Sequence, residues 1–273
     1  MRKIAYVTCQ DLPNLNPSDR LTFPYLAEQG FRVQAVAWDN TNVLWQDFDA
    51  VVIRSTWDYH TRYDEFLCWL DNLAEVNLLN PAKVVRWNSN KTYLRDLSAR
   101  GIPIVPTVWL GENDDIPAIL QEKGWHKAVL KPTISATAYN THLVTLDRKP
   151  ESPPGEMMLQ PFMPQITEEG EWSLLFFGGI FSHAILKRPM PGDFRVQNDF
   201  GGTIERLTPP GFLVEQAARI VEGISSPLLY ARVDGVNVNQ IFHLMELELI
   251  EPDLYLDPDT ARNFADALLK FIR

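Results

Sequence analysis

Three acidic residues near the carboxyl-terminal end, Asp234, Glu246 and Glu248, have the types and spacing of a magnesium site. Glu246 and Glu248 are two positions apart, so they point to the same face of an extended strand. The segment Gly235 to Gln240 could connect two strands as a hairpin and bring the three carboxylates together. Such a cluster is costly without a cation, and hard oxygen ligands favour Mg²⁺. The alternative is a hairpin with a merely hydrated acidic face.

Cationic side chains at three other places could contact phosphate groups. Lys91 lies near the expected start of a helix, where a lysine opposes the helix dipole and suggests an anionic partner. Lys131 ends an expected strand and precedes small polar residues, an arrangement typical of phosphate contact. Arg195 lies in the glycine-flanked segment Gly192 to Thr203, where it could stabilise a transferring phosphoryl group. Each of these side chains could equally be an ordinary solvated cation.

A further group of polar residues follows the third expected strand, Ala50 to Arg54. In open α/β sheets, ligands bind beyond the carboxyl ends of the strands. Arg54 could hold a carboxylate by two parallel hydrogen bonds, and Ser55, Thr56 and Asp58 could contact polar groups of a substrate. The alternative is a local structure in which Ser55 or Asp58 caps a helix and the neighbouring aromatic residues pack.

In the amino-terminal part of the chain, the elements expected to position these residues alternate between strand and helix. Buried strands are expected at Lys3–Cys9, Phe31–Trp38 and Ala50–Arg54, with helices at Arg20–Gly30 and Asp64–Val76 between and after them. This alternation favours a parallel sheet with helices on its faces. No glycine-rich fingerprint follows the first strand, which argues against a nicotinamide-binding Rossmann domain.

The remainder of the chain predicts mixed α and β structure, with a linker-like stretch at Leu110–Gly124. Its expected elements are a helix at Lys91–Ala99, strands at Ala128–Lys131 and Glu156–Gln160, a hairpin that turns at Gly178–Gly179, and helices at Pro209–Ser225 and Thr260–Ile272.

Size and composition narrow the possible classes of protein. A chain of 273 residues with 45% hydrophobic and 22% charged residues can form one large or two modest globular domains. Its formal charge of −10 argues against a general nucleic-acid or anionic-membrane surface. Cys9 and Cys68 are far apart and predict neither a disulfide framework nor a zinc site. No apolar run is long enough for a membrane span or signal peptide, so we expect a cytoplasmic protein.

The order of these features resembles the ATP-grasp superfamily of carboxylate–amine ligases. The resemblance covers about Asn80 to Tyr255, and the amino-terminal part is similar to that superfamily's pre-grasp domain. It implies a pre-ATP-grasp α/β domain over 1–85 and an ATP-grasp domain over 86–273, with a small lid over about 105–162. The stretches ELIEP, RSTWDY and VVRWNSNK look most like the branch that contains the cycloserine-biosynthesis cyclo-ligase.

The resemblance implies a nucleotide site. Lys91 and Lys131 match the lysines that hold the ATP phosphates, and Glu169 or Glu171 lies where an acidic residue commonly meets the ribose. The adenine would be contacted by the stretch Leu159 to Met163, which contains Gln160, Pro161, Phe162 and Met163.

The resemblance also implies catalytic and metal-binding roles. Asp234, Glu246 and Glu248 match the ligands of one or two Mg²⁺ ions, although relatives usually have Asn in place of Glu248. Arg195, together with Lys187, would stabilise the transferring phosphoryl group. Arg195 precedes the pair Gly201–Gly202 as in glutathione synthetase and the ribosomal-protein glutamate ligases, which implies that Gly201 and Gly202 contribute to substrate binding.

The implied function is ATP-dependent joining of a carboxylate to an amine through an acyl phosphate, on an amino acid or a small peptide-like metabolite. The implied partners are small-molecule carboxylate and amine substrates, without nucleic acid or membrane, and superfamily members are often homodimers. Two alternatives remain open: a phosphotransferase that stops at a phosphorylated small molecule, and a non-catalytic ATP-binding protein. Analysis of the products separates the three.

Overall fold

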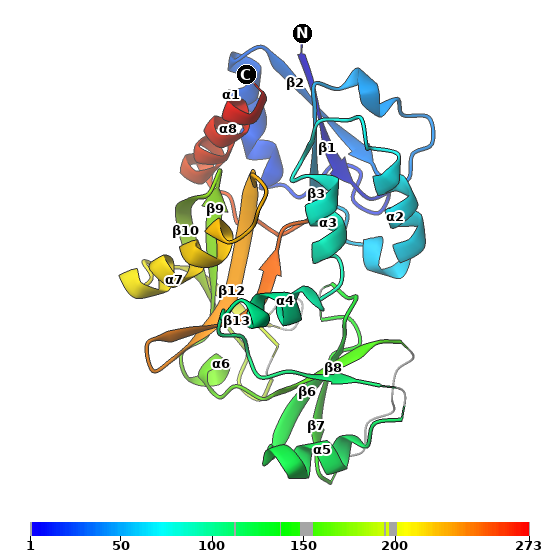
Figure 1. Ribbon diagram of the computed structural model, residues 1–273. Helices are drawn as coiled ribbons and strands as arrows, with labels where there is room; N and C mark the ends of the chain where they lie inside the picture. Colours follow the sequence, from blue (N-terminus) through cyan, green and yellow to red (C-terminus); the bar gives the residue numbers. More distant parts are fainter. Residues whose placement is uncertain are drawn as a thin grey trace.

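The computed structural model describes residues 2–111, 113–136, 138–147, 155–193, 195–196 and 201–272, and three sheets organise them. The first is a parallel sheet in the order β2-β1-β3-β4 (Figure 1), formed by β1 (Arg2–Thr8), β2 (Phe31–Ala37), β3 (Ala50–Ser55) and β4 (Leu78–Leu79). Every residue of β3 is buried, which explains its uninterrupted apolar sequence before Arg54. The predicted parallel sheet is confirmed.

Short helices cover this sheet and connect its strands. They are η1 (Asp19–Thr22), α1 (Phe23–Glu28), η2 (Trp45–Asp47), η3 (Tyr59–Thr61) and α2 (Tyr63–Asp71). The single helix expected at Arg20–Gly30 is divided into η1 and α1, and Gly30 follows it with φ 83°, a left-handed conformation suited to glycine. The helix expected to reach Val76 ends at Asp71.

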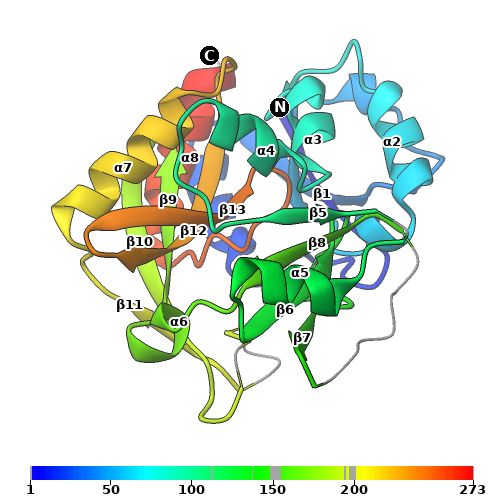
Figure 2. The same cartoon turned by 60° about the horizontal axis from the view of Figure 1, so that its bottom comes forward.

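The second sheet forms a small lobe of its own. Its antiparallel order is β5-β8-β6-β7, with β5 (Val108–Leu110), β6 (Lys127–Pro132), β7 (His142–Thr145) and β8 (Met157–Pro161). Helix α5 (Ile116–Lys123) lies against this sheet (Figure 2) and buries Ile116 and Leu120 on it. The prediction of a linker at Leu110–Gly124 was therefore wrong, because α5 occupies most of it.

The third sheet is antiparallel and forms the centre of the molecule. Its order is β11-β10-β9-β12-β13, formed by β9 (Glu171–Phe177), β10 (Ile180–Arg188), β11 (Thr203–Arg206), β12 (Tyr230–Val238) and β13 (Ile241–Glu248). The predicted turn between β9 and β10 is confirmed, since Gly178 and Gly179 connect them with φ values of 58° and 80°. Helix α6 (Gln165–Glu168) precedes β9, and α7 (Gly211–Glu222) packs on the sheet.

The β12–β13 hairpin differs from the expected connection at Gly235–Gln240. Gly235 lies inside β12, and the turn consists of Asn239 and Gln240, with φ values of 52° and 67°. The pairing register shifts between Asp234 and Gly235. A Cβ atom on Gly235 would lie 2.5 Å from the His243 carbonyl oxygen, so only glycine fits this close approach.

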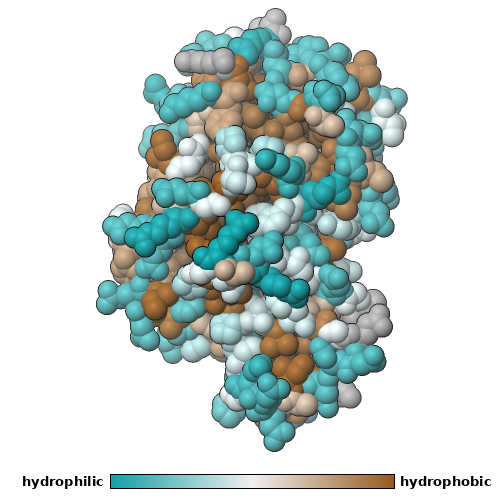
Figure 3. Space-filling view, viewed as in Figure 1, coloured by the Kyte–Doolittle hydropathy of each residue, from teal (hydrophilic) through white to brown (hydrophobic). Residues whose placement is uncertain are grey.

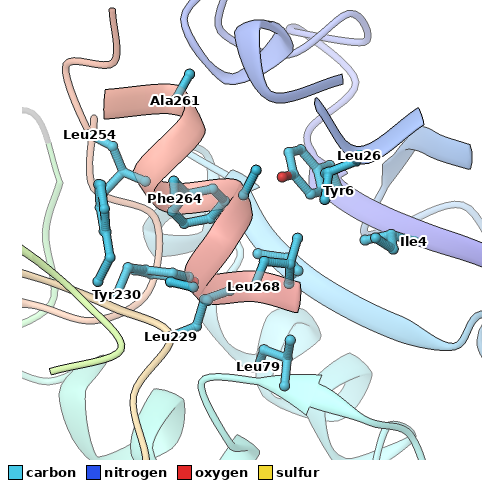
Figure 4. Close-up of a cluster of buried hydrophobic side chains, with 14 of the residues drawn as sticks. Ile4, Tyr6, Leu26, Leu79, Leu229, Tyr230, Leu254, Ala261, Phe264 and Leu268 are labelled. Carbon is cyan, nitrogen blue, oxygen red and sulfur yellow. The ribbon is translucent and has the colours of Figure 1, made fainter. Parts of the chain in front are cut away.

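The first and third sheets share one apolar core through the last helix, α8 (Pro258–Ile272). Figure 4 shows Phe264 of α8 between Tyr6 of β1 and Tyr230 of β12, and the three side chains are fully buried. Helices α3 (Ala82–Asn88) and α4 (Tyr93–Ala99) connect the first sheet to the small lobe. The apolar core around α8 contains residues from both sides of residue 85. The domain boundary at residue 85 therefore stays a prediction.

Hydrophilic side chains cover most of the face seen in Figure 3, which has the same view as Figure 1. Over the described part of the chain, no helix is both long and apolar enough to span a bilayer.

Candidate active site

A cavity of about 390 Å³ lies where the three regions meet. The small lobe contributes Lys131, the central sheet contributes Lys187 and the face of the β12–β13 hairpin, and the segment after β3 contributes Trp57 and Tyr59. The cavity therefore collects most of the charged residues predicted from the sequence, and its size is within the ordinary range of small-molecule sites.

Asp234 is held by two cations. Its carboxylate accepts hydrogen bonds from Arg232 Nε at 3.0 Å and Nη2 at 2.9 Å, and from Lys187 Nζ at 3.4 Å. Burial alone would raise the pKa of Asp234, but the charges of Arg232 and Lys187 lower it below its usual value. Asp234 is thus an ionised carboxylate with its oxygens already occupied.

Glu246 lies across the hairpin from Asp234 and faces two lysines from outside the sheet. Lys131 Nζ is 3.2 Å and Lys91 Nζ is 3.7 Å from Glu246 Oε1. Burial would raise the pKa of Glu246, but the charges of Lys91 and Lys131 lower it to about 2. Lys91 also donates to the Ser135 carbonyl at 2.9 Å, which connects it to the small lobe.

Glu248 is the third carboxylate on this face and pairs with Arg232, its register partner on β12. Burial, opposed by the charge of Arg232 and assisted by that of Asp234, raises the pKa of Glu248 to about 7. Arg232 was not assigned a role from the sequence. Its spacing from Asp234, two residues along one strand, is the signal that would have placed it in the site.

The three carboxylates of the hairpin differ in how well they fit a Mg²⁺ site. Within the described ranges, no group of three His, Cys, Asp or Glu is arranged to hold a metal ion. Glu246 and Glu248 line the cavity, and their side chains are 27% and 28% exposed. The side chain of Asp234 is only 3% exposed. Two accessible carboxylates beside two lysines fit Mg²⁺, which takes its other ligands from phosphate and water. Asp234 fits the role of a counter-ion for Arg232 and Lys187 better than that of a metal ligand.

The residues expected to contact adenine and ribose divide into two groups. Gln160, Pro161, Met163 and Glu171 line the cavity. Phe162 and Glu169 lie outside its lining; the Phe162 backbone N–H donates to the Lys127 carbonyl at 3.0 Å, and Glu169 accepts from the Trp172 indole at 2.9 Å. Of the two acidic residues proposed for the ribose, the structure brings Glu171 into the cavity.

Lys187 lies deeper, between Glu171 and Asp234. Burial would lower the pKa of Lys187, but the charges of Asp234 and Glu171 raise it, so the ammonium group stays charged. Burial in turn raises the pKa of Glu171 in spite of Lys187. The ammonium group can therefore supply positive charge at the cavity wall but not accept a proton.

Arg195 lines the cavity on the segment after β10. Asp193 holds its guanidinium, with Nη2 2.7 Å and Nε 3.1 Å from the two carboxylate oxygens. A Cβ atom on Gly202 would lie 2.3 Å from the Val196 carbonyl oxygen, so this glycine lets the two sides of the segment approach. Gly201, with φ 77°, precedes it, and neither glycine lines the cavity. Phe194 and residues 197–200 lie outside the described residues.

The polar residues at the end of β3 are placed differently from the expectation. Arg54 is 1% exposed; its Nε donates to Asp19 Oδ1 at 3.0 Å and its Nη2 to the Pro252 carbonyl at 2.9 Å. Ser55 donates to Asp19 Oδ2 at 3.2 Å. The two residues therefore complete a buried ion pair with Asp19 and do not line the cavity, which corrects the substrate contacts expected of them.

Thr56 and Asp58 also lie outside the cavity lining. Thr56 Oγ1 is buried and has no hydrogen-bond partner among the residues that the structure describes. Asp58 accepts a hydrogen bond from the Trp38 indole at 2.9 Å. Their neighbours Trp57 and Tyr59, which the sequence predicted only to pack, are the residues that reach the cavity.

The segment after β13 supplies cavity residues that the sequence analysis did not identify. Glu251 and Asp253 both line the cavity. Trp57 Nε1 donates to the Glu251 carbonyl at 3.1 Å, and Arg54 donates to the carbonyl of the next residue, Pro252. The polar stretch after β3 thus positions the segment that carries two cavity carboxylates.

Comparison with known proteins identifies the family. The chain is 30% identical to the cycloserine biosynthesis protein DcsG of Streptomyces lavendulae, with 89% of this chain and 90% of that protein covered. A family model described as the N-terminal domain of D-cycloserine synthetase DcsG matches residues 4–80. The crystal structure of D-cycloserine synthetase DcsG superposes with a TM-score of 0.84 at 27% identity, covering 99% of this chain and 100% of that chain.

A more distant structure has the same fold. The ATP-grasp ligase PsnB, solved with a phosphomimetic variant of its minimal precursor, Mg and ADP, superposes with a TM-score of 0.66 at 13% identity, with 99% and 98% of the two chains covered. The predicted fold class and the predicted class of enzyme, a ligase that forms carbon–nitrogen bonds, are confirmed. The chain belongs to the family of D-cycloserine synthetase DcsG and is an ATP-grasp ligase.

Proposed function

We propose that this ligase closes a ring in a small amino acid and that its product is D-cycloserine or a close analogue. The γ-phosphoryl group of ATP passes to a carboxylate oxygen of the substrate. A nitrogen of the same molecule then bonds to the acyl carbon, phosphate leaves, and the nitrogen loses a proton. The similarity to D-cycloserine synthetase over 89% of the chain supports this choice of product.

One observation carries the proposal: three lysines, two arginines and the carboxylates proposed to hold Mg²⁺ belong to the lining of a single cavity of about 390 Å³. They are Lys91, Lys131, Lys187, Arg195, Arg232, Glu246 and Glu248. Phosphoryl transfer needs little covalent help from a protein and depends on positioned positive charge, which this arrangement supplies.

Nucleotide binding would exchange partners within this group. Lys91 and Lys131 contact Glu246 and lie where they can turn to phosphate oxygens. Val129, Met163 and Ile166 give the same cavity an apolar wall suited to a base, with Glu171 for the ribose. We infer that Glu246 and Glu248 hold one or two Mg²⁺ ions, which would neutralise phosphate charge when bound.

Arg232 and Lys187 would stabilise the oxygens that gain charge during both steps. Arg232 is fixed by three hydrogen bonds to Asp234 and one to the Asp253 carbonyl at 3.2 Å, so its guanidinium is already oriented. Arg195 lies on the segment after β10 and can cover the reacting groups, which would limit hydrolysis of the acyl phosphate.

The test follows the carboxylate oxygen. The enzyme is incubated with ATP, Mg²⁺ and β-aminooxy-D-alanine, the ring-opened form of D-cycloserine, with ¹⁸O in its carboxylate; free D- and L-amino acids form the comparison panel. Release of ADP, appearance of a cyclic product and transfer of ¹⁸O to inorganic phosphate support the proposal. A stable phosphorylated product without a new carbon–nitrogen bond would show a phosphotransferase. Absence of turnover with every substrate would favour a non-catalytic ATP-binding protein.

We also expect a homodimer, as is common in the superfamily. Light scattering coupled to gel filtration tests this expectation, and a mass near 31.2 kDa would contradict it.

A further inference from the structure

Four carboxylates of the cavity each have a cation within ion-pairing distance. The pairs are Glu171–Lys187, Asp234–Arg232, Glu246–Lys131 and Glu248–Arg232. Glu251 and Asp253 differ from these four, since neither carboxylate forms an ion pair with any residue that the structure describes. Asp253 Oδ1 accepts a hydrogen bond from the Tyr255 backbone N–H at 2.8 Å, so Glu251 is the better candidate for a charged ligand. The family resemblance assigned no role to this residue.

Glu251 belongs to the cavity lining and is partly buried. The same lining contains Tyr59, Lys91 and Arg232.

The backbone around Glu251 is fixed in place by the amino-terminal region. Trp57 Nε1 donates to its carbonyl at 3.1 Å, and Arg54 Nη2 donates to the Pro252 carbonyl at 2.9 Å. The Tyr230 hydroxyl donates to the Ile250 carbonyl at 2.7 Å. Three hydrogen bonds to three consecutive carbonyls fix the backbone of Glu251 at the cavity. A carboxylate without an ion-pair partner among the described residues would have a lower free energy in solvent, so the fold holds Glu251 at the cavity against this preference.

The surroundings of Glu251 disfavour its negative charge. Burial and the charge of Glu248 raise the pKa of Glu251 to about 8, although Lys91 and Arg232 act in the opposite direction. A ligand with an ammonium group would remove this cost by pairing with the carboxylate. Trp57, Tyr59 and Tyr255 also line the cavity and offer ring faces, which attract cations.

We infer that the Glu251 carboxylate binds the free amino group of the amino acid substrate. This inference rests on the proposed function and adds a residue that recognises the substrate. The carboxylate that becomes phosphorylated would then lie toward Arg232 and Glu248, on the phosphate side of the same cavity.

The experiment measures binding of D-cycloserine, which has one free amino group, and of N-acetyl-D-cycloserine, which has none. Calorimetry is done on the full chain with saturating ADP and Mg²⁺, for the wild type, Glu251→Gln and the surface control Glu215→Gln. We expect the wild type and the control to bind only the free amine. Glu251→Gln should bind it at least about tenfold more weakly, the usual size of a lost charge-assisted contact, with ADP affinity unchanged. Thermal unfolding checks that the variant is folded.

Equal binding of the two compounds by the wild type, or unchanged binding of the free amine by Glu251→Gln, would overturn the inference. The ¹⁸O assay separates this failure from failure of the proposed function. If the wild type forms the cyclic product and Glu251→Gln has the same KM for the amino acid, only the role of Glu251 is wrong. If the wild type neither binds the free amine nor forms product, both proposals fail.

Discussion

Asp234 on β12 and Glu246 on β13 are direct register partners in an antiparallel hairpin. Two like charges at such positions repel each other and normally destabilise a sheet. Here each carboxylate has its own cations, Arg232 and Lys187 on one side and Lys131 on the other. The hairpin therefore depends on residues from β10 and from the small lobe, which ties its stability to the assembled cavity.

The register of this hairpin depends on Gly235, which leads to a first prediction. A Cβ atom there would lie 2.5 Å from the His243 carbonyl oxygen and 2.6 Å from the Phe242 ring. Gly235→Ala should lower the free energy of unfolding by about 2 kcal/mol, as overpacking usually does, and lower kcat by displacing Asp234 from Glu246. Urea denaturation and steady-state assays measure the two effects.

Gly211→Ala is the matched control, since Gly211 begins α7 and a Cβ there meets nothing within 4 Å. It should leave stability equal or slightly higher. Equal stability of the two variants would contradict the account of the register shift.

Arg195 gives a second prediction. Asp193 holds its guanidinium, and we expect the catalytic contact of Arg195 to form mainly in the transition state. Arg195→Ala should lower kcat about 100-fold or more, while the Kd for ADP changes less than about threefold. Exposed Arg219→Ala is the control. Parallel losses of nucleotide affinity and rate would assign Arg195 to ground-state binding instead.

The buried pair of Arg54 and Asp19 gives a third prediction. Asp19→Asn would leave the Arg54 guanidinium, 1% exposed, without a carboxylate. The free energy of unfolding should fall by about 3 kcal/mol, the usual cost of breaking a buried pair. The double variant Asp19→Leu, Arg54→Met should regain most of that loss, because no charge then remains buried. A stable Asp19→Asn protein would show that Arg54 is not held as described.

A fourth prediction concerns pH and stability. His183 is 4% exposed, with its Nε2 3.0 Å from the Leu254 carbonyl, and burial lowers the pKa of His183 to about 4. The unfolded chain takes up a proton below its ordinary pKa, near 6.5, while the folded chain does not until about 4. The contribution of His183 is therefore complete above pH 6.5 and is lost as the pH falls toward 4.

Between pH 7 and pH 5 this loss should amount to about 2 kcal/mol. His183→Gln keeps a donor for the Leu254 carbonyl but does not titrate. Denaturation of both proteins at the two pH values isolates the contribution of His183, because all other groups are common to them. Identical pH dependence would mean that the pKa of His183 is the same in the folded and unfolded chains.

The sequence predicted the parts of the fold that depend on local pattern. Strands β1 and β3 contain continuous buried apolar runs, and parallel strands covered on both faces have that composition. The short helices α3, α5 and α6 were missed. Helix α3 begins after Pro81 and contains two valines. Helix α5 has Ile116, Ile119 and Leu120 at helical spacing, but it has only 8 residues and contains Pro117, so the pattern is too short to be distinctive.

The site residues could be predicted where they lie close together in sequence on one hairpin. Asp234, Glu246 and Glu248 lie on one hairpin, so their shared face follows from a two-residue period. The partner of Arg54 could not be predicted, because Asp19 precedes it by 35 residues and only the folded chain brings them together. Glu251 was missed for the same reason, since its position depends on Trp57, which is distant in sequence.

Helix α8 is the last element of the chain, yet Phe264 and Leu268 share a core with Ile4 and Tyr6 of the first strand. These partners are far apart in sequence, and β1 is synthesised long before α8. The first sheet therefore keeps one apolar face uncovered until α8 has left the ribosome. Premature termination before α8 should yield a product that aggregates or is degraded, even though every cavity residue named above would already have been made.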